Sequence, residues 1–249
     1  MESSPRRKVP YYREDLALIH HLGFGFHADA CAPGILRLLE PARRRDGLVI
    51  EIGCGSGLLT AYLVDGGLRV MATDASEAML NLAKAHASGA TELRRLTLPD
   101  DPIPLADAIV GVGHALNYLD DESQVEAALV AIATSLRPGG IMAIDLCDLE
   151  WGTLRVSQPP RVWRTDDWVL ITEVSVPEPN RFVRIMTTFV RQDDGTWRRD
   201  DERHDNVLID TSKVPRLLAH HGVEATLSAS FGDEPLMAGL VTVVGRKAA

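Results

Sequence analysis

Short apolar runs, each closed by a polar residue or a glycine, recur through the first 150 residues of the chain. The clearest of them span residues 48–52, 70–73, 108–112 and 141–146. The segments between these runs, such as 58–65 and 121–136, have the length and apolar spacing of helices. Strands that alternate with helices predict an α/β fold with a buried, mostly parallel sheet.

The first 40 residues lie outside this alternation. From Tyr11 their apolar positions recur at helical spacing, with a break around residues 23–25 and a restart near Pro33. We expect two helices that cover the sheet as a lid (residues 1–40), and a frayed stretch over residues 1–10.

Beyond Glu150 the period changes from that of helices to that of strands. Four stretches rich in β-branched and aromatic residues are separated by turn signals at residues 177–180 and 193–195. They predict an antiparallel meander inserted over residues 151–207. A helix closed by Gly222 and two final strands then complete the core, which comprises residues 41–150 and 208–249.

Composition and charge exclude several classes of function. The net charge is −9, so the basic footprint needed to bind nucleic acid is missing. No apolar run is long enough to span a membrane, and the N-terminus lacks the apolar core of a signal peptide. The three cysteines have no metal-ligand spacing, so we expect no metal site, no disulfide framework and a cytoplasmic location.

The turn after the first apolar run carries the strongest chemical signal. It has the pattern Glu51-x-Gly53-x-Gly55-x-Gly57, and Asp74 ends the next run about twenty residues later. Glycines at this turn let a ligand approach the backbone, and an acid at the second strand end suits ribose hydroxyls. A carboxylate beside the loop would repel a pyrophosphate but suits a ligand with an amino group and a sulfonium.

This segment resembles motif I of the class I S-adenosylmethionine-dependent methyltransferases. The Leu-Arg-Pro-Gly-Gly sequence before the run at residue 141 is also typical of that family, and residues 11–25 resemble the opening of bacterial small-molecule methyltransferases. The resemblance implies a doubly wound, mostly parallel seven-stranded sheet with an antiparallel final strand. It also implies methyl transfer from S-adenosylmethionine to an N or O atom of a small-molecule acceptor, with a homodimer as the candidate assembly.

The same resemblance implies which residues bind the cofactor. The loop glycines would meet its amino-acid part, Glu51 would face the loop N–H groups or the ammonium, and Asp74 would bind the ribose. The small side chain of Cys54 suits packing within the loop better than nucleophilic chemistry. The full expected set is Tyr11, Glu51, Gly53, Cys54, Gly55, Gly57, Asp74, Ala75, Met79, Thr97, Leu98 and Gly113.

The acceptor side carries weaker signals. His114 follows the fourth strand at the edge where ligands bind in open α/β sheets, so it is a candidate general base or acceptor ligand. An unperturbed imidazole would titrate near neutrality. The alternative is a histidine that is hydrogen-bonded at a strand end. His20, Tyr118 and His204 are further candidates for acceptor contacts, although His204 also fits a solvated strand position.

Two other functions remain open from the residues alone. An NAD(P)-dependent oxidoreductase would need the spacing Gly-x-Gly-x-x-Gly, from which the third glycine here departs by one position. A non-catalytic S-adenosylmethionine-binding protein would keep the same loop and the same Asp74.

Overall fold

The computed structural model describes residues 11–249 and contains a seven-stranded sheet in the order β10-β11-β5-β4-β1-β2-β3. All pairs between β5 and β3 are parallel, whereas β11 runs antiparallel to both of its neighbours. The predicted fold class and the antiparallel final strand are therefore confirmed. The strands are β1 Leu48–Ile52, β2 Arg69–Asp74, β3 Glu92–Arg95, β4 Ala106–Gly111, β5 Leu136–Cys147, β10 Val223–Ser228 and β11 Leu240–Lys247.

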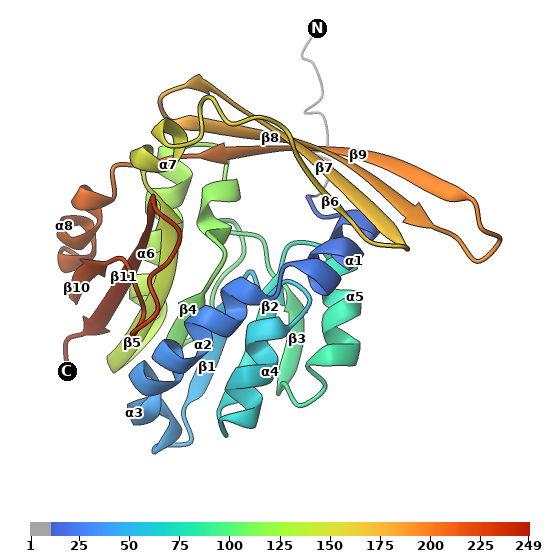
Figure 1. Cartoon of the computed structure of the whole chain (residues 1–249). Helices are drawn as coiled ribbons and strands as arrows, with labels where there is room; N and C mark the ends of the chain where they lie inside the picture. The colour runs from blue at the N-terminus through green and yellow to red at the C-terminus, as the bar shows by residue number, and fades with distance from the viewer. Residues whose placement is uncertain (1–10) are drawn as a thin grey trace, which may run out of the picture.

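Helices cover both faces of this sheet, because its central strands are apolar on both sides (Figure 1). In β1, Ile50 and Ile52 join the core beneath α6 and α8, whereas Val49 joins the core beneath α2, α4 and α5. Continuous burial is what a parallel sheet between two helical layers requires. The helices are α1 Glu14–Gly23, α2 Phe26–Leu38, α3 Glu40–Arg43, α4 Leu58–Asp65, α5 Glu77–His86, α6 Glu122–Ser135, α7 Leu149–Thr153 and α8 Val214–Ala219, with 3₁₀ turns η1 Ala115–Tyr118 and η2 Thr211–Lys213.

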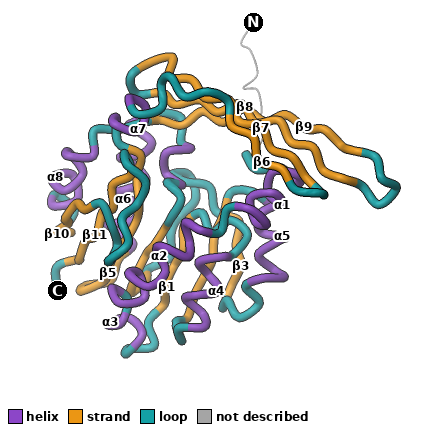
Figure 2. The backbone as a smooth tube through the Cα atoms, in the orientation of Figure 1, coloured by secondary structure: helices purple, strands orange, loops and turns teal. Residues whose placement is uncertain are grey.

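The inserted segment forms a separate four-stranded antiparallel sheet, in the order β6-β7-β8-β9. It overhangs the carboxyl edge of the core sheet, as the tube view also shows (Figure 2). Helix α1 lies beneath it, where Leu16 and Ile19 pack against Trp168 and Met186. The predicted meander is confirmed, with strands β6 Arg161–Arg164, β7 Trp168–Glu178, β8 Arg181–Arg191 and β9 Trp197–Val207.

Three predicted boundaries are wrong, each for a local reason. The second N-terminal helix restarts at Phe26 rather than near Pro33, which lies inside α2. Strand β5 begins at Leu136, since Leu136 pairs with Ala106 before a register shift brings Ile141 opposite Ala108. The expected helix over residues 212–221 is divided into η2 and α8.

The expected fraying of residues 1–10 concerns a stretch outside the described residues. Within residues 11–249, no helix combines the length and apolar character that a bilayer span needs.

Candidate active site

The glycine loop between β1 and α4 has a backbone that favours glycine. Gly53, Gly55 and Gly57 all have positive φ, at 66°, 56° and 84°. A Cβ on Gly53 would lie 2.5 Å from the Cβ of Ala115, so this glycine is also needed for packing. A Cβ on Gly55 would meet only the Met79 sulfur, at 3.9 Å, so Gly55 faces open space where a ligand can approach.

Asp74 at the end of β2 fixes the shape of this loop. One carboxylate oxygen accepts the N–H of Gly55 at 2.8 Å, and the other accepts the N–H of Ser76 at 2.8 Å. Each oxygen keeps a further lone pair for a ligand hydroxyl. Burial raises the pKa of Asp74, and the backbone donors oppose that rise.

Glu51 does not take the orientation toward the loop N–H groups that the sequence suggested. Its Oε2 accepts the Thr60 hydroxyl of α4 at 2.6 Å, and the loop donates to Asp74 instead. Burial raises the pKa of Glu51 to about 8, so the side chain is mostly protonated at neutral pH. Its alternative partner, the cofactor ammonium, remains a prediction.

A cavity of about 460 Å³ lies at the carboxyl ends of β1, β2 and β4. It brings together nine of the twelve residues predicted for the cofactor: Tyr11, Gly53, Gly55, Asp74, Ala75, Met79, Thr97, Leu98 and Gly113. Its charged lining is acidic, with Asp74, Asp100 and Asp120 against Arg95. This lining suits S-adenosylmethionine, which has a net positive charge and ribose hydroxyls, so we call it the cofactor cavity.

The three remaining cofactor candidates lie elsewhere. Glu51 and Cys54 face the neighbouring cavity described next, and burial raises the pKa of the Cys54 thiol, which therefore stays uncharged. Gly57 lines neither cavity, because its Cα packs against Ala83 and Ala87 of the α5 end.

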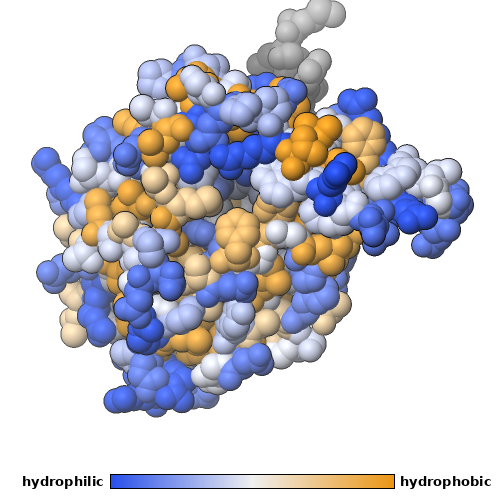
Figure 3. All heavy atoms as spheres, viewed as in Figure 1, coloured by the Kyte–Doolittle hydropathy of each residue, from blue (hydrophilic) through white to orange (hydrophobic). Residues whose placement is uncertain are grey.

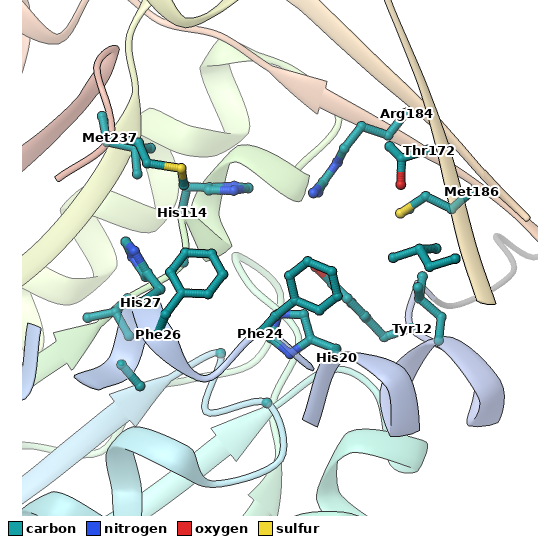
Figure 4. Close-up of a pocket in the computed structure, with 18 of the residues that line it drawn as sticks. Tyr12, His20, Phe24, Phe26, His27, His114, Thr172, Arg184, Met186 and Met237 are labelled. Carbon is teal, nitrogen blue, oxygen red and sulfur yellow. The ribbon is translucent and has the colours of Figure 1, made fainter. Parts of the chain in front are cut away.

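A second cavity, of about 280 Å³, lies between the glycine loop and the overhanging β6–β9 sheet; we call it the acceptor cavity. The space-filling view shows the surface hollowed beneath that sheet (Figure 3). The two cavities share the wall formed by Tyr12, His20, Gly53, Gly55, Val112 and Gly113. In close-up, Arg184, Thr172 and Met186 point down from the sheet, opposite Phe24, Phe26 and His27 (Figure 4).

His114 lines the acceptor cavity in a left-handed conformation, with φ 50°. Asp145 at the end of β5 holds this turn by accepting the N–H groups of Gly113 (3.0 Å) and His114 (2.7 Å). Burial and the nearby Arg184 lower the pKa of His114 to about 3. The expectation that it titrates near neutrality is therefore wrong, and His114 is a neutral imidazole whose buried Nδ1 has no hydrogen bond within residues 11–249.

His27 is a cation at the base of the same cavity, and the sequence did not single it out for a role. Its Nε2 lies 2.8 Å from the buried Asp145 carboxylate. Although burial opposes charging, the bonds to Asp145 and Cys31 raise the pKa of His27 to about 10. The signal available in the sequence was Asp145 itself, a single acid within the apolar run 141–146.

The His27–Asp145 pair should make stability depend on pH in a defined direction. Because the folded pKa lies above the unfolded value of 6.5, the pair stabilises the fold fully below pH 6.5 and loses this effect as pH rises toward 10. We expect His27→Gln to lower the free energy of unfolding by about 3 kcal/mol at pH 6 and by much less at pH 10. Urea denaturation across this range measures it, with exposed His220→Gln as the control. A pH-independent difference would contradict the pairing.

His204 is fully buried, so its reading as a solvated strand position is wrong. Its ring packs between those of Tyr11, Tyr12 and Tyr118, with centroid distances of 4.7–5.5 Å. Its Nε2 contacts Glu202 at 2.9 Å. Burial lowers the pKa of His204 to about 4 despite this carboxylate, so the imidazole is neutral at pH 7.

Glu202 also fastens the N-terminal segment to the β6–β9 sheet. Its two oxygens accept the N–H groups of Tyr12 and Arg13, each at 2.8 Å. On the other side of the segment, the Ser76 hydroxyl donates to the carbonyl of Tyr12 at 2.8 Å. The segment before α1 therefore lies between the cofactor cavity and the overhanging sheet.

Two other acceptor candidates lie at the junction of the cavities. His20 lines both, and burial lowers its pKa to about 4. Tyr118 lines the cofactor cavity, while its hydroxyl bonds the Tyr12 hydroxyl at 2.8 Å and the Arg184 guanidinium. Across the described part of the chain, no three His, Cys, Asp or Glu side chains are grouped to hold a metal ion.

Comparison with known proteins places this geometry in a family. Residues 49–140 match the model of a methyltransferase domain. A methyltransferase of Geobacillus sp. (strain WCH70) is 25% identical over 205 residues, covering 80% of this chain and 83% of the relative. The glycine N-methyltransferase of Mus musculus is 32% identical over 114 residues, but the match spans only 39% of either chain.

The fold likeness extends beyond the matched domain. The sugar N-methyltransferase KedS8 from Streptoalloteichus sp ATCC 53650 has a TM-score of 0.78 at 18% sequence identity, and the alignment covers 100% of this chain and 99% of KedS8. The domain match itself contains the glycine loop, Asp74 and His114. The domain match, the relatives and the shared fold together support assignment of the chain as a class I S-adenosylmethionine-dependent methyltransferase.

Proposed function

We propose that the protein transfers the methyl group of S-adenosylmethionine to an N or O atom of a small molecule held beneath the β6–β9 sheet. The observation that carries the proposal is the wall shared by the two cavities, formed in part by Gly53, Gly55 and Gly113. A cofactor on one side of this wall presents its sulfonium to an acceptor on the other. The volume of the acceptor cavity, about 280 Å³, favours a small metabolite as the acceptor.

The residues around the junction act by binding, orienting and excluding water. When bound, S-adenosylmethionine supplies an electrophilic methyl group and leaves as a neutral thioether, so no departing anion needs stabilisation. His20, His114 and His204 are neutral at pH 7 and do not repel the sulfonium. The rings of Phe24 and Phe26 line the acceptor cavity and give it an apolar surface that disfavours water beside a bound acceptor.

His114 is a positioning group in this proposal. Its free Nδ1 accepts a hydrogen bond from the acceptor N–H or O–H and aims the lone pair at the methyl group. We expect His114→Ala to lower kcat/KM about ten- to hundredfold, the equivalent of one hydrogen bond in a closed site. Cofactor affinity should stay within about twofold of wild type.

The pH profile separates positioning from base catalysis by His114. With a pKa of about 3, His114 contributes no ionisation between pH 5 and 8. Wild type and His114→Ala should therefore give profiles of the same shape, displaced only in height. If wild-type activity rises with pH around pH 6.5 and His114→Ala lacks this rise, His114 acts as a general base.

We also propose that residues 11–40 act as a lid, because Glu202 holds them over the cofactor cavity. Glu202→Gln removes one carboxylate oxygen from the contacts to Tyr12 and Arg13. We expect the dissociation rate of S-adenosylhomocysteine to rise about tenfold in stopped-flow measurements. Glu173→Gln, an exposed change on strand β7 of the same sheet, is the control. Equal rates in the two variants would remove Glu202 from this role.

A panel of metabolites with amine and hydroxyl groups tests the function itself. The expected result is cofactor-dependent formation of S-adenosylhomocysteine together with a product heavier by one methylene, read by mass spectrometry. Cofactor binding without turnover across the panel would favour the non-catalytic alternative. The oxidoreductase alternative has lost its support, because the domain match is to methyltransferases.

A further inference from the structure

The two cavities differ in the sign of their charge, although the protein as a whole is acidic. The cofactor cavity has three aspartates against one arginine. Among the described residues, the acceptor cavity is lined by three arginines, Arg155, Arg161 and Arg184, and by one carboxyl group, that of Glu51. Since Glu51 is mostly protonated at neutral pH, the acceptor cavity is positive in a chain of net charge −9.

Arg184 lies in this cavity as a half-buried cation. It lies on β8 at an inward-facing position, between Phe182 and Met186 in the alternation of the strand. The sequence does contain this signal, because the alternation puts a charged residue where an apolar one is expected. In the close-up, the guanidinium points from the sheet into the space beside His114 and above Phe24 (Figure 4).

The protein partners of Arg184 are neutral. One nitrogen donates to the Tyr118 hydroxyl and, at 3.3 Å, to Oδ1 of Asn206. Burial raises the pKa of Tyr118, so this phenol stays protonated. Within residues 11–249 no ion pair includes Arg184, and its buried Nε has no hydrogen bond.

A half-buried guanidinium without a carboxylate partner is unfavourable, because its partial desolvation is not offset by an opposite charge. Asp145 and Glu202, the nearby buried acids, are already held by His27 and by backbone N–H groups. None of the residues 11–249 supplies the missing anion, so a bound ligand can provide it. Arginine suits this role, since its planar fork binds carboxylates and phosphates through paired hydrogen bonds.

We propose that Arg184 binds an anionic group, a carboxylate or a phosphate, on the methyl acceptor. This inference rests on the proposed function, since it assigns the substrate class of the same cavity. Arg161 and Arg155 line the cavity toward the segment that leads into β6 and add to its positive potential. Arg155 is already held, with its guanidinium 3.3 Å above the Trp151 ring and bonded to two backbone carbonyls.

The same charge favours methylation of an amine at the other end of the acceptor. The arginines of the cavity disfavour a further positive charge there, which lowers the pKa of a bound amine. A neutral amine has the free lone pair that methyl transfer requires. The acceptor class that fits the cavity is therefore a small amine that also bears a carboxylate or a phosphate.

Binding of non-reacting probes tests the anion site without relying on turnover. The protein is saturated with S-adenosylhomocysteine and titrated by calorimetry with glucose, gluconate and glucose 1-phosphate. These probes share the carbon skeleton of glucose. Glucose is uncharged, gluconate bears a carboxylate, and glucose 1-phosphate bears a phosphate. We expect gluconate or glucose 1-phosphate to bind at least tenfold more tightly than glucose, with affinity that falls as salt rises. The probe that binds identifies carboxylate or phosphate as the recognised group.

Variants assign this binding to Arg184. Arg184→Gln should weaken binding of the anionic probe at least tenfold, Arg184→Lys should weaken it less, and Arg191→Gln should leave it unchanged. Arg191 is an exposed arginine at the end of the same strand. Equal binding of charged and uncharged probes, or wild-type binding by Arg184→Gln, would overturn the proposal.

Failure of the proposed function has a different signature. It is seen as loss of S-adenosylhomocysteine binding in wild type, or as absence of turnover on a panel that includes matched amines with and without an anionic group. Turnover that does not distinguish the members of such a pair would leave the function intact and remove Arg184 as the anion site.

Discussion

Replacing Gly55 by valine is expected to abolish S-adenosylmethionine binding while the protein remains folded. Gly55 lines both cavities, so a branched side chain there enters the space of the ligand. The protein itself has room for the new Cβ, whose nearest neighbour would be the Met79 sulfur at 3.9 Å. The φ of 56° adds strain of roughly 1–2 kcal/mol, a loss that a folded domain of this size tolerates.

The control for this variant is Gly67→Val. Gly67 has a φ of 80° and no atom within 4 Å of the position that a Cβ would take, and it lies at the opposite end of α4 from the glycine loop. Both variants should lose similar stability by thermal unfolding, but only Gly55→Val should lose cofactor binding by calorimetry, more than hundredfold. If Gly55→Val binds as well as Gly67→Val, the loop is a turn rather than part of the cofactor site.

Asp74→Ala should weaken cofactor binding roughly hundredfold. The carboxylate is expected to hold the ribose hydroxyls through charge-assisted bonds, and a loss of about 3 kcal/mol corresponds to two decades of affinity. Its removal also frees the Gly55 N–H, which Asp74 now holds at 2.8 Å. Asp74→Ala therefore removes the ribose ligand and, at the same time, a hydrogen bond that fixes the glycine loop.

Charge alone does not account for the effect expected at Asp74. Asp100→Ala removes a carboxylate from the same cavity, but Asp100 is exposed at its rim. We expect this control to change affinity by less than about threefold at 0.15 M salt. An affinity loss of equal size in both variants would show that Asp74 acts through the net charge of the cavity and not as a ribose ligand.

Local signals predicted the core of this fold well. The runs that became β1, β2 and β4 are apolar on both faces, and the side chains of Ser76 and Asp121 cap the following helices by accepting backbone N–H groups. The glycine loop and Asp74 were predictable because a backbone with positive φ and an acid at a strand end leave a direct trace in the sequence. The resemblance to class I methyltransferases supplied the other cofactor candidates, and nine of the twelve predicted residues line the cofactor cavity.

The acceptor side was less predictable because its chemistry depends on burial and on contacts distant in the sequence. His114 and His27 are both histidines near the same carboxylate, yet their pKa values move in opposite directions, to about 3 and about 10. Burial and Arg184 lower the pKa of His114, which meets Asp145 only through its backbone N–H, whereas the ring of His27 bonds Asp145 directly and its pKa rises. No spacing rule within residues 11–40 indicates that contact with β5.

The acidic charge of the cofactor cavity also affects how strongly the cofactor is held before and after methyl transfer. Methyl transfer removes one positive charge from the cofactor, because the sulfonium becomes a neutral thioether. The acidic lining around Asp74, Asp100 and Asp120 attracts the cofactor before the reaction more strongly than after it. The charge of the pocket thus favours the fresh cofactor over the spent one, so the spent form is held less strongly when it leaves.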